Sequence, residues 1–190
     1  AFQKRQQLRQ APFHCPVDFL FGNWDLVYFE GRHAMERIPE RVPVRHAKVE
    51  IGSIRGTSSH QYNPAMILCD PAATEDFGSC YGFCFAYSGN FVAGAQKDQR
   101  GLTRVQMGIN PTQFRYTLAA GEAFFTPQVL MSYSSEGFTG LTHQYHDLIR
   151  EHICRGAYKH AKRPVLINNW EATYFDFDKE KDREDRTAGT

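Results

Sequence analysis

The stretch Cys80-Tyr-Gly-Phe-Cys-Phe-Ala-Tyr-Ser-Gly-Asn-Phe-Val-Ala93 decides the fold class that this sequence predicts. An extended backbone sends successive side chains to opposite faces, so this stretch places large rings on one face and small residues on the other. The rings are Tyr81, Phe83, Phe85 and Tyr87, and the small residues include Cys80, Cys84, Ala86 and Ser88. The ring face predicts a core, and the small face allows a second sheet or loop to approach closely. Gly89-Asn90 predicts a two-residue hairpin loop before the next strand.

The same period of two extends outward from Val17 to Ser134. Val49, Ile51 and Ser53 alternate with Lys48, Glu50 and Gly52, and Val105, Met107 and Ile109 alternate with Arg104, Gln106 and Gly108. Turn residues separate such runs at Gln99-Arg100-Gly101, Asn110-Pro111 and Ala120-Gly121-Glu122. Many short strands at this spacing predict an antiparallel sandwich.

The period changes to that of a helix at Gly140. The apolar positions are then spaced by three and four residues, at Leu141, Tyr145, Leu148, Ile149 and Ile153. Thr142 is the predicted N-cap and Gly156 the predicted end of this helix. A basic connection leads to the run 165–170 (VLINNW), which is typical of a strand buried on both faces in a parallel sheet or barrel. The charged tail after Phe177 lacks the amphipathic helix that should follow, so we expect the chain to stop within a second domain.

Composition limits the class of protein. The chain has 190 residues, 42% of them hydrophobic and 14% aromatic, and its net charge is +1 with a pI of about 7.9. This nearly neutral balance argues against a nucleic-acid binder or a polybasic membrane module. No apolar stretch follows the basic residues 4–9, which argues against a secretory signal. Five cysteines without a disulfide-like spacing favour free thiols, so we expect a soluble, cytoplasmic protein.

Three groups of residues have both a structural and a functional interpretation. Cys80 and Cys84 could form half of a metal site, but no second pair is correctly spaced, and we expect no metal. His143 and His146 lie one helical turn apart without the acidic partner of a metalloprotease helix, which favours a packing role. The loop 55–60 predicts side-chain-to-backbone hydrogen bonds, with recognition of a polar ligand as the alternative.

The strongest candidate site follows the predicted C-terminal strand. Residues 168–171 (Asn-Asn-Trp-Glu) would lie at its carboxyl end, where α/β barrels bind their ligands. The Trp170 ring can stack on the apolar face of a sugar, and Asn169 and Glu171 can bind its hydroxyls. The alternative is that Trp170 only closes the mouth of the barrel. Glu171 could act as an acid or base with Asp176 or Asp178, although the spacing does not fix the separation that glycoside cleavage requires.

A set of longer motifs spreads over most of the chain. They are Arg55-Gly56-Thr57-Ser58-Ser59-His60-Gln61 with Asn63-Pro64, Tyr81-Gly82-Phe83, Tyr87-Ser88-Gly89-Asn90-Phe91, Gly108-Ile109-Asn110-Pro111, Thr126-Pro127, Tyr133-Ser134-Ser135-Glu136-Gly137 and the uninterrupted run from Arg163 to Phe175. Together they resemble the α-galactosidases of glycoside hydrolase family 36, over about residues 17–178.

The resemblance implies a mainly β fold: part of an antiparallel β-supersandwich, then a linker helix and the first strand of an incomplete (β/α)8 barrel. It implies that residues 17–139 form the sandwich, 140–163 the linker helix and connection, and 164–178 the first barrel strand. Residues 1–16 and 179–190 do not follow the family pattern.

The resemblance also implies a reaction, the retaining hydrolysis of terminal α-galactosides such as melibiose and raffinose-type sugars. One aspartate acts as nucleophile and a second as general acid/base in the family. Their Lys-Trp-Asp and Asp-Asp-Gly-Trp motifs are absent from this sequence, so no catalytic residue is expected in the chain, and the isolated chain is predicted to be inactive.

The substrate-binding residues that the resemblance implies are Trp170, with Asn169 and Glu171 beside it, and it implies no cofactor or metal. The expected partners are α-galactoside sugars and further copies of the chain that assemble through the sandwich, with neither nucleic acid nor a membrane. Two other functions remain open: a non-catalytic β-sandwich that binds carbohydrate or assembles with another chain, and a raffinose-synthase-like enzyme that transfers galactose.

Overall fold

The structure, a computed structural model, describes residues 6–8, 17–19, 22–166, 168, 170, 174–176 and 178. The chain forms two compact units, Ala1–Ile149 and Arg150–Thr190. The strands are β1 (Gln6–Leu8), β2 (Val17–Phe19), β3 (Asp25–Arg32), β4 (Met35–Pro43), β5 (Val49–Gly52), β6 (Tyr62–Cys69), β7 (Cys80–Phe85), β8 (Phe91–Lys97), β9 (Thr103–Ile109), β10 (Tyr116–Leu118) and β11 (Val129–Ser134). Helix α1 (Gly137–Leu148) and the π-helical turn η1 (Ile149–Ile153) follow. No helix in the described part of the chain is long and apolar enough to cross a membrane.

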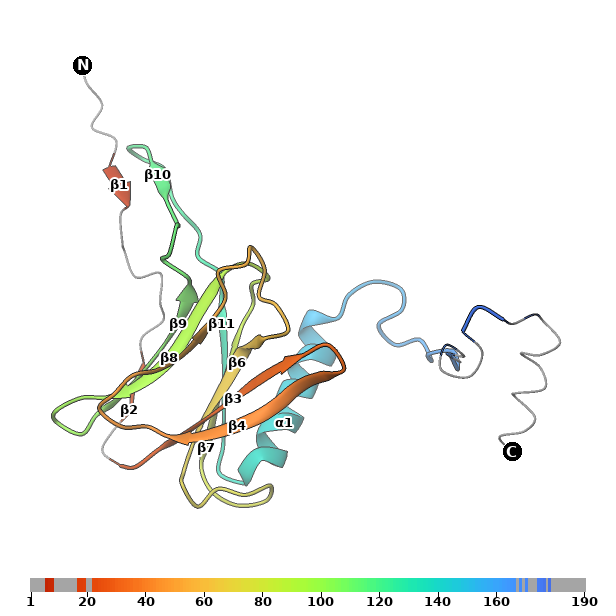
Figure 1. Ribbon diagram of the computed structural model, residues 1–190, viewed down its shortest axis with the longest axis horizontal. Helices are drawn as coiled ribbons and strands as arrows, with labels where there is room; N and C mark the ends of the chain where they lie inside the picture. Colours follow the sequence, from red (N-terminus) through yellow and green to blue (C-terminus); the bar gives the residue numbers. More distant parts are fainter. Residues whose placement is uncertain are drawn as a thin grey trace. The chain divides into compact units, whose positions relative to one another are not determined.

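Two antiparallel sheets build the first unit, as the period of two predicts. One sheet has the strand order β11-β7-β6-β3-β4 and the other the order β2-β9-β8-β5, while β1 and β10 pair as a separate ribbon (Figure 1). The facing sides of the two sheets enclose the main core, in which Leu26, Phe83 and Phe91 are almost completely buried. Tyr81 and Phe85 pack into the same core. The predicted ring face of β7 is therefore confirmed, and it lies inside the sandwich.

Helix α1 packs on the small-residue face of β7. A second buried cluster there contains Cys69, Cys80 and Leu141. Gly82 leaves room for the ring of Tyr145, since a Cβ atom at Gly82 would lie 2.5 Å from Cε2 of that ring. The element that approaches the small face is thus a helix rather than the predicted sheet or loop.

The predicted hairpin at Gly89-Asn90 is not formed. β7 pairs with β6 and β11, whereas β8 pairs with β5 and β9, so residues 86–90 carry the chain from one sheet to the other. Turn residues specify a change of chain direction but do not specify which sheet receives the next strand. The prediction was wrong because both strands bury apolar side chains in one core from opposite sides. The turn at Gln99-Arg100-Gly101 does close a hairpin, between β8 and β9.

Helix α1 begins at Gly137, before the predicted N-cap at Thr142. The backbone N–H groups of residues 137, 138 and 139 donate to the carbonyl oxygens of residues 78, 74 and 75 at 3.0, 3.1 and 2.9 Å. These donors lack partners within the helix, and here the backbone of a distant loop satisfies them in place of a capping side chain. Thr142 lies inside the helix, and its Oγ1 donates to the carbonyl oxygen of Phe138 at 2.8 Å.

The predicted barrel strand is not formed in the described residues of the second unit. Val165 and Leu166 lie outside any strand and are 95% and 90% exposed. A strand that is buried on both faces needs hydrogen-bonded neighbours, and no described segment pairs with this run. The domain boundaries after residues 16, 139, 163 and 178 stay predictions.

Candidate functional site

Two hydrogen bonds hold the backbone of Trp170. Its N–H donates to Oδ1 of Asn168 at 3.1 Å, and its carbonyl oxygen accepts the N–H of Tyr174 at 3.0 Å. The first bond has the pattern of a side-chain cap, and the second joins residues four apart as in an α-helix. The side-chain oxygen of Asn168 therefore holds the backbone of Trp170 in place and leaves the amide NH₂ group for other partners.

Trp170 belongs to a small aromatic cluster. Its ring centroid lies 5.5 Å from that of Tyr174 and 4.9 Å from that of Phe175, with interplanar angles of 71° and 90°. Edge-to-face contacts of this kind fix the orientation of a ring. Trp170 remains 45% exposed. The indole thus combines a supported orientation with free surface, which is what stacking on the apolar face of a sugar requires.

Asn169 and Glu171, the other two predicted substrate-binding residues, lie outside the described residues. Their contacts with a sugar stay predictions. The pairing of Glu171 with Asp176 or Asp178 as two catalytic carboxylates also stays a prediction.

The loop that follows β5 is held by bonds between its own side chains and backbone. Ser53 Oγ donates to the carbonyl oxygen of Thr57 at 2.5 Å, and Ser59 Oγ accepts the N–H of Gln61 at 3.2 Å. No hydrogen bond between a serine of this loop and His60 is seen among the described residues. The predicted side-chain-to-backbone hydrogen bonds of this loop are therefore present, and recognition of a polar ligand by it stays a prediction.

The cysteines of β6 and β7 are packing residues. Burial raises the pKa of the Cys69 thiol to about 12 and raises those of Cys80 and Cys84 above their ordinary value. A protonated thiol is a poor nucleophile and metal ligand. Within the part of the chain that the structure describes, no group of three or more His, Cys, Asp or Glu residues could hold a metal ion. The rings of His143 and His146 lie 6.4 Å apart on exposed positions of α1.

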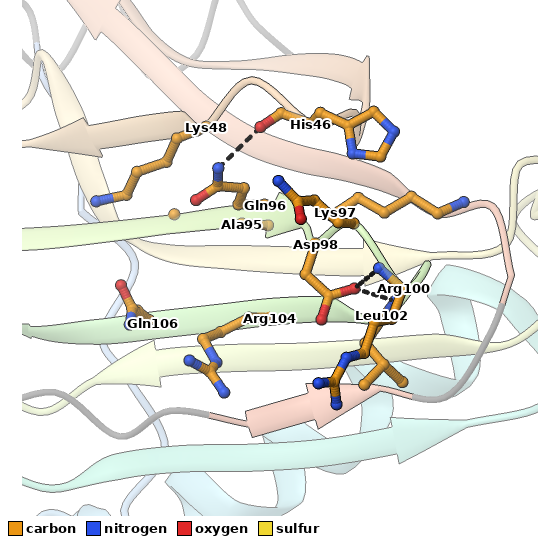
Figure 2. A pocket seen from close by; sticks show the side chains of 12 residues that line it. His46, Lys48, Ala95, Gln96, Lys97, Asp98, Arg100, Leu102, Arg104 and Gln106 are labelled. Atoms are coloured by element: carbon orange, nitrogen blue, oxygen red, sulfur yellow. Dashed lines mark hydrogen bonds between the residues drawn. The ribbon is translucent and has the colours of Figure 1, made fainter.

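One feature of the surface was not predicted from the sequence. A groove of about 930 Å³ lies on the outer face of the sheet β2-β9-β8-β5, next to the β8–β9 turn (Figure 2). The alternation of Arg104 and Gln106 with buried residues indicated an outward face. Only the strand register, however, brings Arg104 opposite Gln96 and Gln106 opposite Gly94.

The fold defines a class: a mainly β protein with an antiparallel sandwich and a helix packed on the outer side of one sheet. Residues 7–119 match the glycosyl hydrolase family 36 N-terminal domain, and residues 123–185 match melibiase. The chain therefore belongs to glycosyl hydrolase family 36. The two matches extend into the end segments 1–16 and 179–190, where the sequence motifs indicated no resemblance.

Several relatives are similar along most of the chain. It is 55% identical over 170 residues to the bifunctional α-galactosidase/sucrose kinase AgaSK of Mediterraneibacter gnavus. The aligned region covers 90% of this chain and 18% of AgaSK. It is 48% identical over 165 residues to α-galactosidase AgaA of Geobacillus stearothermophilus, with 87% and 23% covered.

A crystal structure of an AgaA variant in complex with raffinose has a TM-score of 0.81 at 47% identity, over 89% of this chain and 24% of the other. The chain thus spans about a fifth to a quarter of the length of these relatives.

Proposed function

We propose that this chain is the sandwich-containing part of a retaining α-galactosidase that removes terminal α-galactosyl residues from melibiose- or raffinose-type sugars. The observation that carries the proposal is the similarity to α-galactosidases along nearly the whole chain, at 55% identity to AgaSK and 48% to AgaA. The raffinose in the AgaA crystal structure supports the substrate class.

In this proposal the chain contributes structure and substrate contacts rather than the catalytic pair. The sandwich and α1 form a rigid support. Trp170 stacks on the galactosyl ring, with Asn169 and Glu171 binding its hydroxyls. The catalytic aspartates of the family come from protein outside these 190 residues, since the Lys-Trp-Asp and Asp-Asp-Gly-Trp motifs do not occur in them.

A chimaera tests the proposal. Residues 7–185 replace the matching segment of AgaA, and hydrolysis of raffinose and of an aryl α-galactoside is measured. We expect the chimaera to hydrolyse both substrates, and the 190-residue chain alone to hydrolyse neither. Trp170→Ala in the chimaera should lower kcat/KM by about 10- to 100-fold, because stacking of a flat ligand face on an aromatic side chain contributes on the order of 1–3 kcal/mol.

The control is Tyr158→Ala, which removes an aromatic ring that is 74% exposed in the same unit. It should leave kcat/KM unchanged. Turnover by the isolated chain, or a folded chimaera without activity, would contradict the proposal. An equal loss in the two variants would show that Trp170 has no specific role in substrate binding.

Hydrolysis and transfer are separated by the products. With an aryl α-galactoside as donor and sucrose as acceptor, the complete enzyme that contains this chain should release free galactose; accumulation of raffinose-type products would favour the transferase alternative. We further propose a homo-oligomer that forms through the sandwich, and a cytoplasmic location. Sedimentation of the purified protein and fractionation of the source cells test these two points.

A further inference from the structure

The groove beside the β8–β9 turn has a shape that the backbone imposes. Gly94 lies at its floor, and a Cβ atom there would collide with the carbonyl oxygen of Val49 on the neighbouring strand. No side chain can therefore fill the floor at this position. Gln96, Arg104 and Gln106 project around it from β8 and β9, and Figure 2 shows Lys48 on the other side of β8.

Positive charge dominates the lining of this groove. Among its described lining residues four are cationic, Lys48, Lys97, Arg100 and Arg104, and Asp98 is the one that carries a carboxylate. The chain as a whole has a net charge of only +1, so the excess at the groove is local. Oδ1 of Asp98 accepts the N–H groups of Arg100 and Leu102, both at 2.8 Å, and so holds the turn.

Two of these cations, Lys97 and Arg100, form no ion pair with a carboxylate in the described part of the chain. Lys97 Nζ donates to the carbonyl oxygen of Gly22 at 2.9 Å and to Oδ1 of Asn23 at 3.2 Å, which are both neutral acceptors. The Arg100 guanidinium forms no hydrogen bond or ion pair among the described residues. Lys48 forms an ion pair with Glu50, so its charge is partly neutralised.

The side chains also indicate what the groove does not bind. Sites for neutral sugars use an aromatic ring to stack on the apolar face of the ligand, and none of the described residues that line this groove is aromatic. Its lining offers mainly N–H donors from amides, ammonium groups and guanidinium groups. Such donors match oxygen acceptors that carry negative charge.

We propose that this groove binds a small polyanion, a molecule with two or more phosphate, sulfate or carboxylate groups, in addition to the proposed galactoside site. Its volume of about 930 Å³ exceeds what one phosphate group needs, and Lys97 and Arg100 both belong to its lining. The donors are carried by paired strands and a hydrogen-bonded turn, so little ordering is needed on binding.

The test is titration calorimetry of the chain with tripolyphosphate at an ionic strength of about 0.15 M, where the screening length is about 8 Å, with digalacturonate as the carboxylate-bearing arm. Arg100→Glu reverses one charge in the groove, and Arg115→Glu makes the same change in net charge at an exposed position outside it. Gln106→Glu is nearly isosteric and adds a negative charge inside the groove without removing a described hydrogen bond.

We expect Arg100→Glu to weaken binding by about tenfold or more, Gln106→Glu by several-fold, and Arg115→Glu by less than about twofold, because a charge acts strongly only within a short distance in salt solution. If Arg100→Glu fails to fold, as circular dichroism would show, Gln106→Glu carries the comparison.

Loss of affinity in Arg115→Glu equal to that in the groove variants would overturn the proposal, since it would indicate non-specific attraction. Absence of binding to both probes by the unmodified chain would overturn it as well. A response to tripolyphosphate alone assigns the site to phosphate or sulfate groups, and a response to digalacturonate assigns it to carboxylates. Inactivity of the chimaera with unchanged polyanion binding would contradict the proposed function and leave this inference intact.

Discussion

The attachment of helix α1 to the sandwich depends on the missing side chain at Gly82. A Cβ atom at this position would lie 2.5 Å from Cε2, 2.9 Å from Oη and 3.1 Å from Cζ of Tyr145. Protein interiors are too densely packed to absorb such an overlap, so Gly82→Ala must displace the ring. The displaced ring also loses the hydrogen bond from its hydroxyl to the carbonyl oxygen of Leu130, which is 3.0 Å long.

The expected magnitudes follow from these two losses. Overpacking costs about 1–3 kcal/mol, and the lost hydrogen bond about 1 kcal/mol. Gly82→Ala should therefore lower the free energy of unfolding by about 2–4 kcal/mol. Tyr145→Ala should lower it by about 2–4 kcal/mol through the lost ring. In the double variant the clash is gone, and alanine is favoured over glycine in a strand by about 0.5–1 kcal/mol.

The assay is a double-mutant cycle by urea unfolding, followed by circular dichroism. The double variant should be at least about 2 kcal/mol more stable than the sum of the single effects predicts, because Gly82→Ala is harmless once the ring is absent. Similar denaturant slopes for the four proteins are the control for two-state unfolding. Additivity within about 0.5 kcal/mol would refute the argument that Gly82 is required as the seat of Tyr145.

Three further predictions concern the same unit. The Arg41 guanidinium donates to Asp25 at 2.8 Å and to the carbonyl oxygens of residues 70, 71 and 73. One ammonium group cannot make all of these bonds, so Arg41→Lys should lower the stability in thermal unfolding by about 2–3 kcal/mol. An unchanged Tm would contradict this prediction. Gly137→Ala should destabilise the chain by about 3 kcal/mol or more, since the φ of Gly137 is +68° and a Cβ atom there would meet the carbonyl oxygens of residues 74 and 75. Gly121 has a φ of +84° but lies in open space, so Gly121→Ala should cost only about 1 kcal/mol. Equal losses of stability in urea unfolding would contradict this prediction. Burial raises the pKa of Cys69 from 9.0 to about 12, so the unfolded chain releases this proton at a lower pH than the folded chain. As the pH rises from 9 to about 12, the free energy of unfolding should therefore fall by up to about 1.4 kcal/mol per pH unit. A Cys69→Ala variant should lack this part of the pH dependence, and an identical slope in both proteins would argue against it.

The strands were predictable because they depend on a local rule. In β9, Val105, Met107 and Ile109 are all buried, as their spacing indicates. In β5, Ile51 is buried and Glu50 exposed for the same reason. An extended backbone alternates its side chains whatever the rest of the fold does, so burial of one face can be predicted from the sequence.

The start of α1 was not predictable from local signals. The hydroxyl of Thr142 predicts a side-chain cap, but the helix is capped by the backbone of residues 74–78, some sixty residues away in the sequence. Backbone carbonyl groups are the same in every residue, so no sequence pattern marks them as helix caps. The choice of Gly137 as the first helical residue becomes clear only when this loop lies against it.

The candidate site, too, was predictable from the sequence only in part. The position of Trp170 at the end of an apolar run, beside polar residues, predicts a sugar site, and the structure shows the indole partly exposed and in contact with Tyr174 and Phe175. The strand expected to carry it is absent from the described residues, in which the side-chain oxygen of Asn168 accepts the backbone N–H of Trp170. An apolar run has no preference between strand and helix until neighbours supply hydrogen bonds and cover.

The linear order of residues was therefore sufficient for the faces of the strands, the class of the sandwich and, through its motifs, the family. Tertiary structure alone decided that β7 and β8 belong to different sheets, that α1 covers Cys80 and Gly82, and that Arg104 and Gln106 join Lys97 around one groove. The physical reason is the range of the interactions. Side-chain alternation is set by each residue's own backbone, whereas sheet membership, helix capping and a shared groove arise from contacts between segments that are distant in the chain.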